Sequence, residues 1–354
     1  MQETADLDDS AALLEQVNQA LANATPLRIQ GANSKAFLGR VTAGEILDTR
    51  SHRGIVRYDP TELVITVRCG TPLSELAKVL DAAQQMLPCE PPAFSDGATV
   101  GGMIASGLSG PRRPWSGSVR DFVLGTRVIT GLGKHLRFGG EVMKNVAGYD
   151  LSRLMAGSYG TLGLITEVSL KVLPKPRQSL SISLPMSVEH ALLRLAEWGQ
   201  QPLPISAACH DGESLHLRLE GGEGSVAAAH DRLGGELLDP SYWADLNEQR
   251  LAFFDEDQPL WRLSVPNNTP RLSLPGRQLI DWGGAQRWLK SDAQAPFIRK
   301  VVAEAGGHVT CYSHGLTDTP FQPLPDALLR YHQQLKQQLD PQGIFNPGRL
   351  YAEL

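Results

Sequence analysis

The sequence predicts an α+β protein with two domains and a C-terminal helix. A chain of 354 residues is long enough for two cored domains of about 100–200 residues each. In its first half, short β-branched segments are followed by amphipathic helices, and the prolines of LPKPRQ at 173–178 then interrupt this pattern. We therefore expect one domain over residues 1–178, a smaller α+β domain over 179–320, and a helix and tail over 321–354.

The elements of the first domain follow from apolar spacing. Residues 10–22 carry apolar side chains at helical intervals, which predicts an opening amphipathic helix. Residues 26–30 predict a short strand that runs into a glycine and polar turn, and residues 62–68, which are rich in β-branched residues and bounded by turn signals, predict a second strand. Residues 72–87 place leucines and alanines on one helical face. A strand, a turn and a helix thus form the first structural unit.

The same reasoning applies to the rest of that domain and to the tail. DFVLGTRVIT and KHLRFGG, at 121–130 and 134–140, flank a Gly-Leu-Gly turn and predict a β-hairpin. Residues 149–156 predict a short helix, and the alternating pattern over 163–173 predicts a strand. Residues 327–339 predict the final amphipathic helix. Residues 179–320 are rich in β and α segments, but their order is ambiguous.

Composition excludes some classes of protein. The formal net charge is -5, and no cluster of lysine and arginine is interleaved with aromatic residues, so we expect no nucleic acid partner. The first ten residues are acidic, unlike a signal peptide, and no segment has the roughly 18 consecutive apolar residues of a membrane span. We expect a cytoplasmic protein that reaches the inner membrane, if at all, through its partners.

Four cysteines, at positions 69, 89, 209 and 311, are too far apart for CxxC pairs. A local iron–sulfur cluster or zinc knuckle is therefore not expected, and the chain is predicted to hold no metal. Reduced structural thiols are the simpler interpretation.

The stretch DGATVGGMIASGLSG, at 96–110, has glycines every few residues within an apolar segment. Glycine weakens helices and strands but is tolerated where the backbone approaches a ligand closely. Freed N–H groups, with hydroxyls from Thr99, Ser106 and Ser109, would make a concave site for a pyrophosphate. The alternative interpretation is a glycine-rich turn between core elements.

Two other segments, 31–35 and 157–163, share this character of small residues and glycines. A nicotinamide-binding GxGxxG between a strand and a helix is absent, and so is the GxxxxGK[ST] loop that binds nucleotide triphosphates. We expect the three segments to meet around one extended ligand.

With these motifs the chain resembles the FAD-linked oxidoreductases of the vanillyl-alcohol oxidase-like (PCMH-type) superfamily, which includes the 2-hydroxy-acid dehydrogenases. The resemblance covers residues 20–178 and the tail. Its motifs are an arginine-x-x-glycine first loop, the ATVGG segment, GYDLSRLMAGSYGTLGLITEVSLKVLPKP, and the terminal LDPQGIFNPGRL. It implies a PCMH-type FAD-binding domain of two α/β subdomains, a cap domain, and a tail that returns to the flavin domain.

The resemblance also implies which residues bind FAD: the first loop at the pyrophosphate, the second at the phosphates and isoalloxazine, and the third at the adenosine half, with an asparagine returning from the tail. These residues are Gly31, Ala32, Asn33, Ser34, Thr99, Val100, Gly101, Gly102, Ser106, Gly107, Gly160, Gly163, Ile165 and Asn346. No histidine or cysteine in these loops has an evident attachment role, so the FAD is expected to be non-covalent.

The chain departs from this family at two points. Tyr159 stands where many relatives have a glutamate in GSEGTLG, which removes a charge near the cofactor. The HxGDGNxH motif of the catalytic members, which supplies metal ligands and a base, is absent. The catalytic residues are therefore unknown from sequence.

Two groups are candidates for catalysis. Arg112, Arg113 and Arg120 could stabilise a reduced flavin or an acidic substrate, or could lie on a solvent-facing loop. His308 and His314 would share one face of a strand and could act as ligands or bases, but histidines there are more often hydrogen-bonded or solvated.

Within the superfamily, the chain is similar to FAD-binding subunits of multi-subunit glycolate dehydrogenases. This implies a sister FAD-linked subunit that oxidises a small 2-hydroxy acid, glycolate and possibly D-lactate, and an iron–sulfur subunit that receives the electrons. One alternative is a self-sufficient flavin dehydrogenase with a base from His308, His314 or Tyr149. The other is a structural subunit in which FAD only stabilises the fold.

Overall fold

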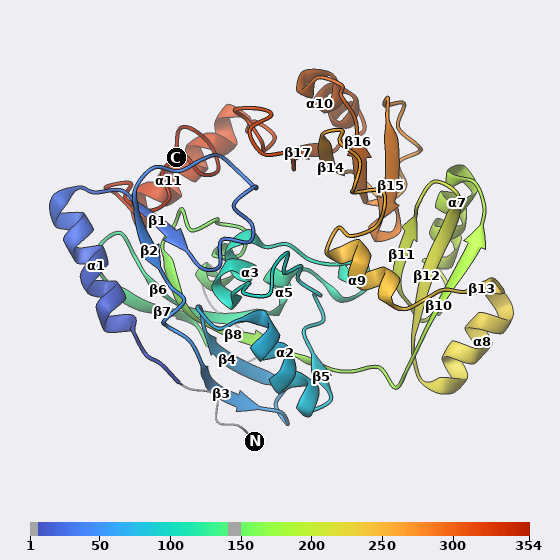
Figure 1. The fold of residues 1–354 in the computed structure, drawn as a ribbon, viewed down its shortest axis with the longest axis horizontal. Helices are drawn as coiled ribbons and strands as arrows, with labels where there is room; N and C mark the ends of the chain where they lie inside the picture. The colour runs from blue at the N-terminus through green and yellow to red at the C-terminus, as the bar shows by residue number, and fades with distance from the viewer. Residues whose placement is uncertain (1–5, 141–149) are drawn as a thin grey trace. The chain divides into compact units, whose positions relative to one another are not determined.

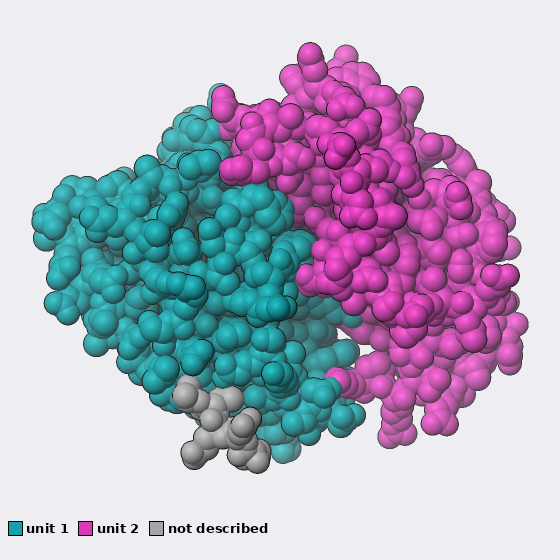
Figure 2. Space-filling view, in the orientation of Figure 1, with its two compact units in different colours: residues 1–109, 118–174, 323–354 teal, residues 110–117, 175–322 magenta. Residues whose placement is uncertain are grey.

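The computed structural model describes residues 6–140 and 150–354. These form two compact units, coloured separately in Figure 2. Unit 1 contains residues 1–109, 118–174 and 323–354, and unit 2 contains residues 110–117 and 175–322. Helices and sheets occur in both, which confirms the expected α+β class. The short segment 110–117 belongs by its contacts to unit 2, although the chain on both sides of it belongs to unit 1.

Unit 1 contains helices and strands from both ends of the chain (Figure 1). They are α1 (Ser10–Asn23), β1 (Leu27–Gln30), β2 (Glu45–Asp48), β3 (Ile55–Asp59), β4 (Val64–Arg68), α2 (Leu73–Ala82), β5 (Gln85–Met86), α3 (Val100–Ser106), α5 (Val119–Phe122), β6 (Val123–Ile129), β7 (His135–Gly139), α6 (Leu151–Leu154), β8 (Leu164–Lys171), β9 (Leu173–Pro174) and α11 (Asp326–Leu339).

The main sheet of unit 1 has five antiparallel strands in the order β3-β4-β8-β6-β7. β8 lies in the centre, and its residues from Leu164 to Leu170 are all buried. Helices α2 and α3 contribute Leu76 and Met103 to one core with Ile65 of β4. Burial of these side chains, at about 1.5–3 kcal/mol each, holds the helices on the sheet.

A second, two-stranded parallel sheet pairs β1 with β2. Its core combines Leu13 and Val17 of α1 with Leu27 of β1 and with Phe345 from the C-terminal tail. The backbones of Leu27 and Phe345 also form a parallel bridge. The tail therefore lies beside β1, the strand that directly precedes the first loop.

Unit 2 is built on one large sheet (Figure 1). Its elements are α4 (Arg113–Ser116), β10 (Gln178–Pro185), α7 (Val188–Trp198), β11 (Ile205–His210), β12 (Ser214–Gly221), α8 (Glu223–Leu233), β13 (Glu236–Leu237), α9 (Ser241–Asn247), β14 (Leu260–Ser264), β15 (Arg277–Asp281), the 3-10 turn η1 (Trp282–Gly284), β16 (Gln286–Lys290), α10 (Ala295–Glu304) and β17 (His308–Cys311).

The eight strands of this sheet run in the order β13-β10-β12-β11-β15-β16-β14-β17. Helices α7 and α8 share a core with β10, β11 and β12, through residues such as Ala191, Val226 and Leu217. Helix α10 packs through Ile298 on the other half of the sheet, which includes Leu263 of β14. The sheet thus carries two hydrophobic cores, one shared with α7 and α8 and the other with α10.

Most elements expected in unit 1 are confirmed, including the opening helix, the hairpin, the central strand and the final helix. The helix expected over 72–87 ends earlier, at Ala82, because Gln84 has a φ of +54° and the chain enters the short strand β5. All four cysteines are buried free thiols, as expected. Within the described residues, no helix combines the length and the apolar character that crossing a membrane requires.

Candidate functional site

The first loop, residues 31–35, begins where β1 ends at Gln30. In the described part of the chain, the backbone N–H groups of residues 31–34 have no hydrogen-bond acceptor. Asn33 has a φ of +60°, a left-handed conformation that asparagine adopts more readily than most residues. Unpaired N–H groups are costly when they are not solvated. A run of such groups is suited to bind an anion.

The glycine-rich run was expected to be a loop, and this was wrong, because residues 100–106 form helix α3. The hydroxyl of Thr99 caps the helix by accepting a hydrogen bond from the Gly102 N–H at 3.2 Å. Such a cap contributes about 1 kcal/mol and offsets the weak helix propensity of two glycines. A Cβ added to Gly31 would lie 2.4 Å from the Thr99 hydroxyl oxygen. The first loop therefore packs directly against the start of α3.

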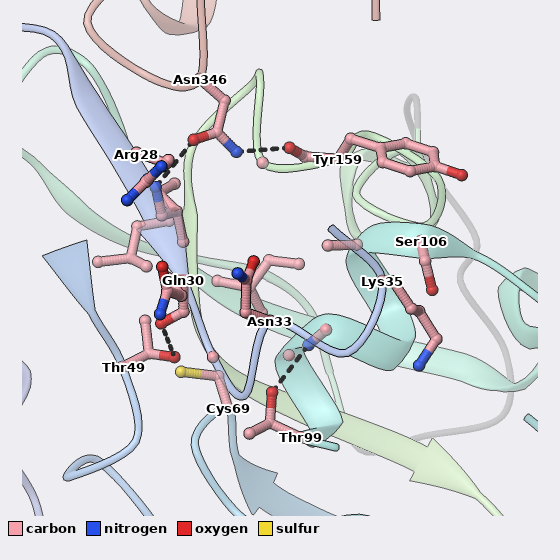
Figure 3. Close-up of a pocket in the computed structure, with 18 of the residues that line it drawn as sticks. Arg28, Gln30, Asn33, Lys35, Thr49, Cys69, Thr99, Ser106, Tyr159 and Asn346 are labelled. Atoms are coloured by element: carbon pink, nitrogen blue, oxygen red, sulfur yellow. Dashed lines mark hydrogen bonds between the residues drawn. The ribbon is translucent and has the colours of Figure 1, made fainter. Parts of the chain in front are cut away.

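The third segment, residues 157–163, is joined by Asn346 from the tail to β1, the strand that precedes the first loop (Figure 3). The Asn346 side chain accepts a hydrogen bond from the Ile29 N–H at 2.8 Å and donates one to the Tyr159 carbonyl at 2.6 Å. A Cβ added to Gly160 would lie 2.6 Å from the Asn346 amide nitrogen, so glycine is required there for close approach. The asparagine thus links β1 to the turn.

These segments surround one pocket, whose hollow contains about 950 Å³ of empty space, part of it open to solvent. Most expected cofactor-binding residues line it, namely Gly31, Ala32, Asn33, Ser34, Thr99, Gly101, Gly102, Ser106, Gly160, Gly163, Ile165 and Asn346. Val100 does not, because it is fully buried in the core under α3. Gly107 does not either, since it ends α3 in a left-handed conformation, against the backbone of Gly157.

Among the described residues that line the pocket, all the charges are positive. They come from Arg28, Lys35 and Arg349, and these described lining residues include no aspartate or glutamate. Arg349 donates hydrogen bonds to the carbonyls of Lys35 at 3.4 Å and Ala36 at 3.2 Å, and so ties the tail to the end of the first loop. Burial lowers the pKa of its guanidinium. This field favours an anionic ligand.

Sequence reasoning placed Lys35 in a segment expected to meet the ligand, residues 31–35, but it missed Arg28 and Arg349 as pocket residues. Arg28 and Arg349 stand within the quoted RIQG and NPGRL motifs, which was the available signal, but a single arginine in a motif does not show which way it points. Tyr159 is the residue that stands where many relatives have a glutamate. It lines the pocket, has a φ of +51° and is held through its backbone carbonyl.

The three candidate arginines do not line this pocket. Arg112 is buried in unit 2, where it forms an ion pair with Glu220. Arg113, in the same unit, lies with its guanidinium 4.4 Å from the ring centre of Trp282. Arg120 is exposed on the short helix α5 of unit 1. A catalytic role for any of them stays a prediction.

The expectation that His308 and His314 share a strand face was wrong, because β17 ends at Cys311 and His314 lies in the following turn. Burial lowers the pKa of His308, which favours its neutral form. Across the described ranges, 6–140 and 150–354, no cluster of three or more histidine, cysteine or acidic residues could hold a metal ion. Tyr149, the other candidate base, lies outside the described residues.

Comparison with known proteins defines the class of this fold and site. Residues 5–139 match the FAD binding domain family. The fold is similar to that of alkyldihydroxyacetonephosphate synthase, with a TM-score of 0.67 and 17% identity over 95% of this chain and 75% of that one. The chain therefore carries an FAD-binding domain of the expected PCMH type.

Comparison of the whole sequence finds relatives whose function is more specific than FAD binding. It is 64% identical to glycolate oxidase subunit GlcE of Escherichia coli (strain K12), over 98% of this chain and 99% of the relative. It is 35% identical to glycolate oxidase subunit GlcD of Bacillus subtilis (strain 168), over 38% of this chain and 28% of the relative. A D-lactate dehydrogenase of Anaerostipes hadrus is 34% identical over 52% of this chain and 38% of the relative. The chain belongs to the family of glycolate oxidase subunit GlcE.

Proposed function

We propose that this chain is the FAD-binding subunit of a multi-subunit dehydrogenase that oxidises glycolate, and also D-lactate, to the 2-oxo acid. The observation that carries this proposal is the 64% identity to glycolate oxidase subunit GlcE along almost the entire chain. The 34% identity to a D-lactate dehydrogenase over 52% of this chain supports the second substrate. The proposed partners are a sister FAD-linked subunit related to GlcD and an iron–sulfur subunit.

In this proposal, FAD lies in the pocket of unit 1. The acceptor-free N–H groups of residues 31–34 would hold its diphosphate, and the guanidinium of Arg349 would supply positive charge. The glycines of α3 and of the turn at 157–163 would allow the ligand to approach the backbone. FAD, when bound, supplies the capacity to accept two electrons from a hydroxy acid or a partner flavin.

The bound FAD is proposed to be non-covalent. Within the described lining there is no histidine, and Cys69 is the only cysteine. Burial raises the pKa of the Cys69 thiol to about 12, so the nucleophilic thiolate hardly forms near neutral pH. Acid precipitation of the purified yellow protein is expected to release all the flavin into the supernatant. Flavin that stays with the pellet would contradict the proposal.

Substrate oxidation is proposed to depend on the sister subunit. The described residues that line the pocket include no histidine, aspartate or glutamate that could act as the base for a hydroxy acid. A missing base alone typically costs about 10²–10⁴ in rate. The same lining residues can hold and orient a cofactor, and among those described only Lys35 and Tyr159 carry a side chain that could take a proton from the substrate hydroxyl.

The test is an anaerobic mixture of the pure, FAD-loaded chain with glycolate, with and without the partner subunits, followed by the visible absorbance of the flavin. We expect slow or no bleaching by the chain alone and fast bleaching in the complex. Changing both His308 and His314 to alanine in the complex is expected to leave turnover largely intact. Equal bleaching rates with and without partners would instead favour a self-sufficient dehydrogenase.

We also propose that the complex works in the cytoplasm and meets the membrane only through its partners. Fractionation of cells that produce this chain with and without the partner subunits tests this. Membrane association of the chain alone would refute it.

A further inference from the structure

Helix α11 carries a buried lysine directly behind the turn of the candidate cofactor pocket. The side chain of Lys336 is 10% exposed. Its ammonium group donates three hydrogen bonds, to the carbonyl of Thr161 at 2.7 Å, to the carbonyl of Phe345 at 2.8 Å and to the carboxylate of Asp340 at 2.7 Å. All three donors of the ammonium are thus used.

The carboxylate of Asp340 is fully buried and organises the tail. It accepts hydrogen bonds from the N–H groups of Ile344, at 3.1 Å, and Phe345, at 2.8 Å. With Lys336 it therefore fixes the backbone of the residue immediately before Asn346. We call these two side chains and their four backbone partners the Lys336 hub.

The Lys336 hub connects two walls of the pocket. One wall is the turn at 157–163, held at Thr161, and the other is the tail, held at Phe345. On the pocket side, Asn346 joins the same tail to Tyr159. The spacing between turn and tail is thus set by hydrogen bonds on both sides of the pocket wall, those of Lys336 outside the pocket and that of Asn346 inside it.

Folding alone does not require a charged pair at this place. A buried ion pair gains little stability over well-packed apolar residues, because desolvation offsets the attraction between its charges. Directional contacts, in contrast, specify one geometry. The Lys336 hub is therefore better explained by the geometry it imposes than by the stability it adds.

We propose that Lys336 and Asp340 are positioning residues for the flavin, which set the separation of turn and tail and thereby the affinity and release rate of FAD. This inference rests on the proposed location of FAD in the pocket of unit 1. Neither side chain is among the residues that line that pocket. Their effect on the cofactor is therefore transmitted through the Thr161 and Phe345 backbone.

A cavity beside the Lys336 hub makes a conservative variant possible. It contains about 610 Å³ of empty space, part of it open to solvent, and it is lined by Lys336 together with Ser158, Thr161, Leu162 and other residues of α11 and the tail. An arginine at position 336 could extend into this space and still donate to the same carbonyls, since its guanidinium has five N–H donors. A methionine would keep the length but lose every donor.

The experiment compares Lys336→Met, Lys336→Arg and a control, Lys290→Met, in the full-length chain. Lys290 is also a buried lysine that donates to two backbone carbonyls, those of Phe254 and Glu256, but it belongs to unit 2. Each variant is measured for its FAD dissociation constant and release rate by flavin fluorescence, for the visible circular dichroism of bound flavin, and for thermal stability without FAD.

Lys336→Met is expected to weaken FAD binding by about tenfold or more, and to change the visible dichroism, because hydrogen bonds of a charged group are lost. Lys336→Arg is expected to restore most of both signals. Lys290→Met is expected to lower the melting temperature while FAD binding stays within about twofold. If Lys336→Met does not fold, the paired variant Lys336→Met/Asp340→Leu, which leaves no unpaired charge, replaces it.

The inference is overturned if the folded Lys336 variant binds and releases FAD like the unchanged protein. It is also overturned if Lys290→Met weakens binding equally, which would show a general effect of stability, or if Lys336→Arg rescues neither signal. Failure of the proposed location of FAD would look different, because a pocket substitution such as Gly102→Val would then also leave FAD binding unchanged.

Discussion

Substitution of Gly102 by valine tests the proposed pocket without disturbing the protein core. A Cβ at Gly102 would meet only the Thr99 hydroxyl, at 3.3 Å, and no other protein atom outside its own helix within 4 Å. Gly102 also lines the pocket. A larger side chain there would therefore extend into the space of the ligand, and valine suits the interior of a helix better than glycine. We expect the protein to fold normally.

The expected magnitude follows from the cost of filling occupied space. Extra methyl groups in a well-packed site typically cost about 1–3 kcal/mol. Since each 1.4 kcal/mol changes a dissociation constant about tenfold, we expect weaker FAD binding by a factor between about 5 and about 150. The thermal stability of the apoprotein is expected to change by less than about 1 kcal/mol, because the gain in helix propensity offsets the small shift that the capping hydroxyl of Thr99 must make.

The assay is titration of the apoprotein with FAD, followed by quenching of flavin fluorescence. The control is Gly224→Val in helix α8 of unit 2, where a Cβ would also meet no protein atom within 4 Å. That variant should bind FAD like the unchanged protein. Normal FAD affinity in a folded Gly102 variant, or equal losses in both variants, would refute the location of the cofactor along α3.

Two further predictions follow from glycine geometry and from a carboxylate. Gly160→Ala is expected to lower both FAD affinity and melting temperature, because the new methyl group would collide with Asn346. Gly157→Ala is the control, since it carries similar left-handed backbone strain but its methyl group would meet no described atom within 4 Å. The difference between the melting temperatures of the two variants therefore measures the cost of the collision. Hydrogen bonds from Ser10 lower the pKa of Asp8 to about 2, below its usual 3.8, so its contribution to stability is complete above about pH 4 and is lost as the pH falls towards 2. Asp8→Asn should therefore lower the melting temperature at pH 6 but not at pH 2, and an equal decrease at both would contradict the assignment.

The predictable part of this fold was the part governed by local pattern. The hairpin and the opening helix follow from turn residues and apolar spacing, which act over a few neighbouring positions. Strand β8 was also predicted, from alternation, yet every residue from Leu164 to Leu170 is buried. The sequence pattern could not reveal this, because burial of the second face depends on strands and segments from elsewhere in the chain.

Helix α3 shows why the local pattern failed in the second loop. Three glycines within nine residues favour a loop on propensity alone. The helix nevertheless forms, because Thr99 caps it and because Val100, Met103 and Ile104 bury one face in the core. Tertiary packing outweighed propensity there, and Thr99 before an apolar run was a cap signal that could have been recognised.

For the site itself, the sequence could supply the residues of each segment but not the contacts that assemble them. Asn346 bonds to Ile29 across 317 positions and to Tyr159 across 187. Lys336 and Asp340 are four residues apart, which by spacing alone describes an ordinary exposed helix pair worth a few tenths of a kcal/mol. Only the structure shows that both side chains are buried behind the turn, where they bond to its backbone and to that of the tail and do not form an exposed surface pair.

The position of the tail has a consequence for how the pocket forms. β1, the first loop and the turn are all complete by residue 163. The side chain that links β1 to the turn, however, is that of residue 346, and the arginine that ties the end of the first loop to the tail is residue 349. Closing contacts across so many positions costs entropy that only other contacts can offset. The Phe345 side chain, buried with Leu27, and the Lys336 hub provide those contacts. With FAD in the proposed pocket, we expect its affinity to depend on the anchoring of the last residues as well as on the glycines that line the pocket.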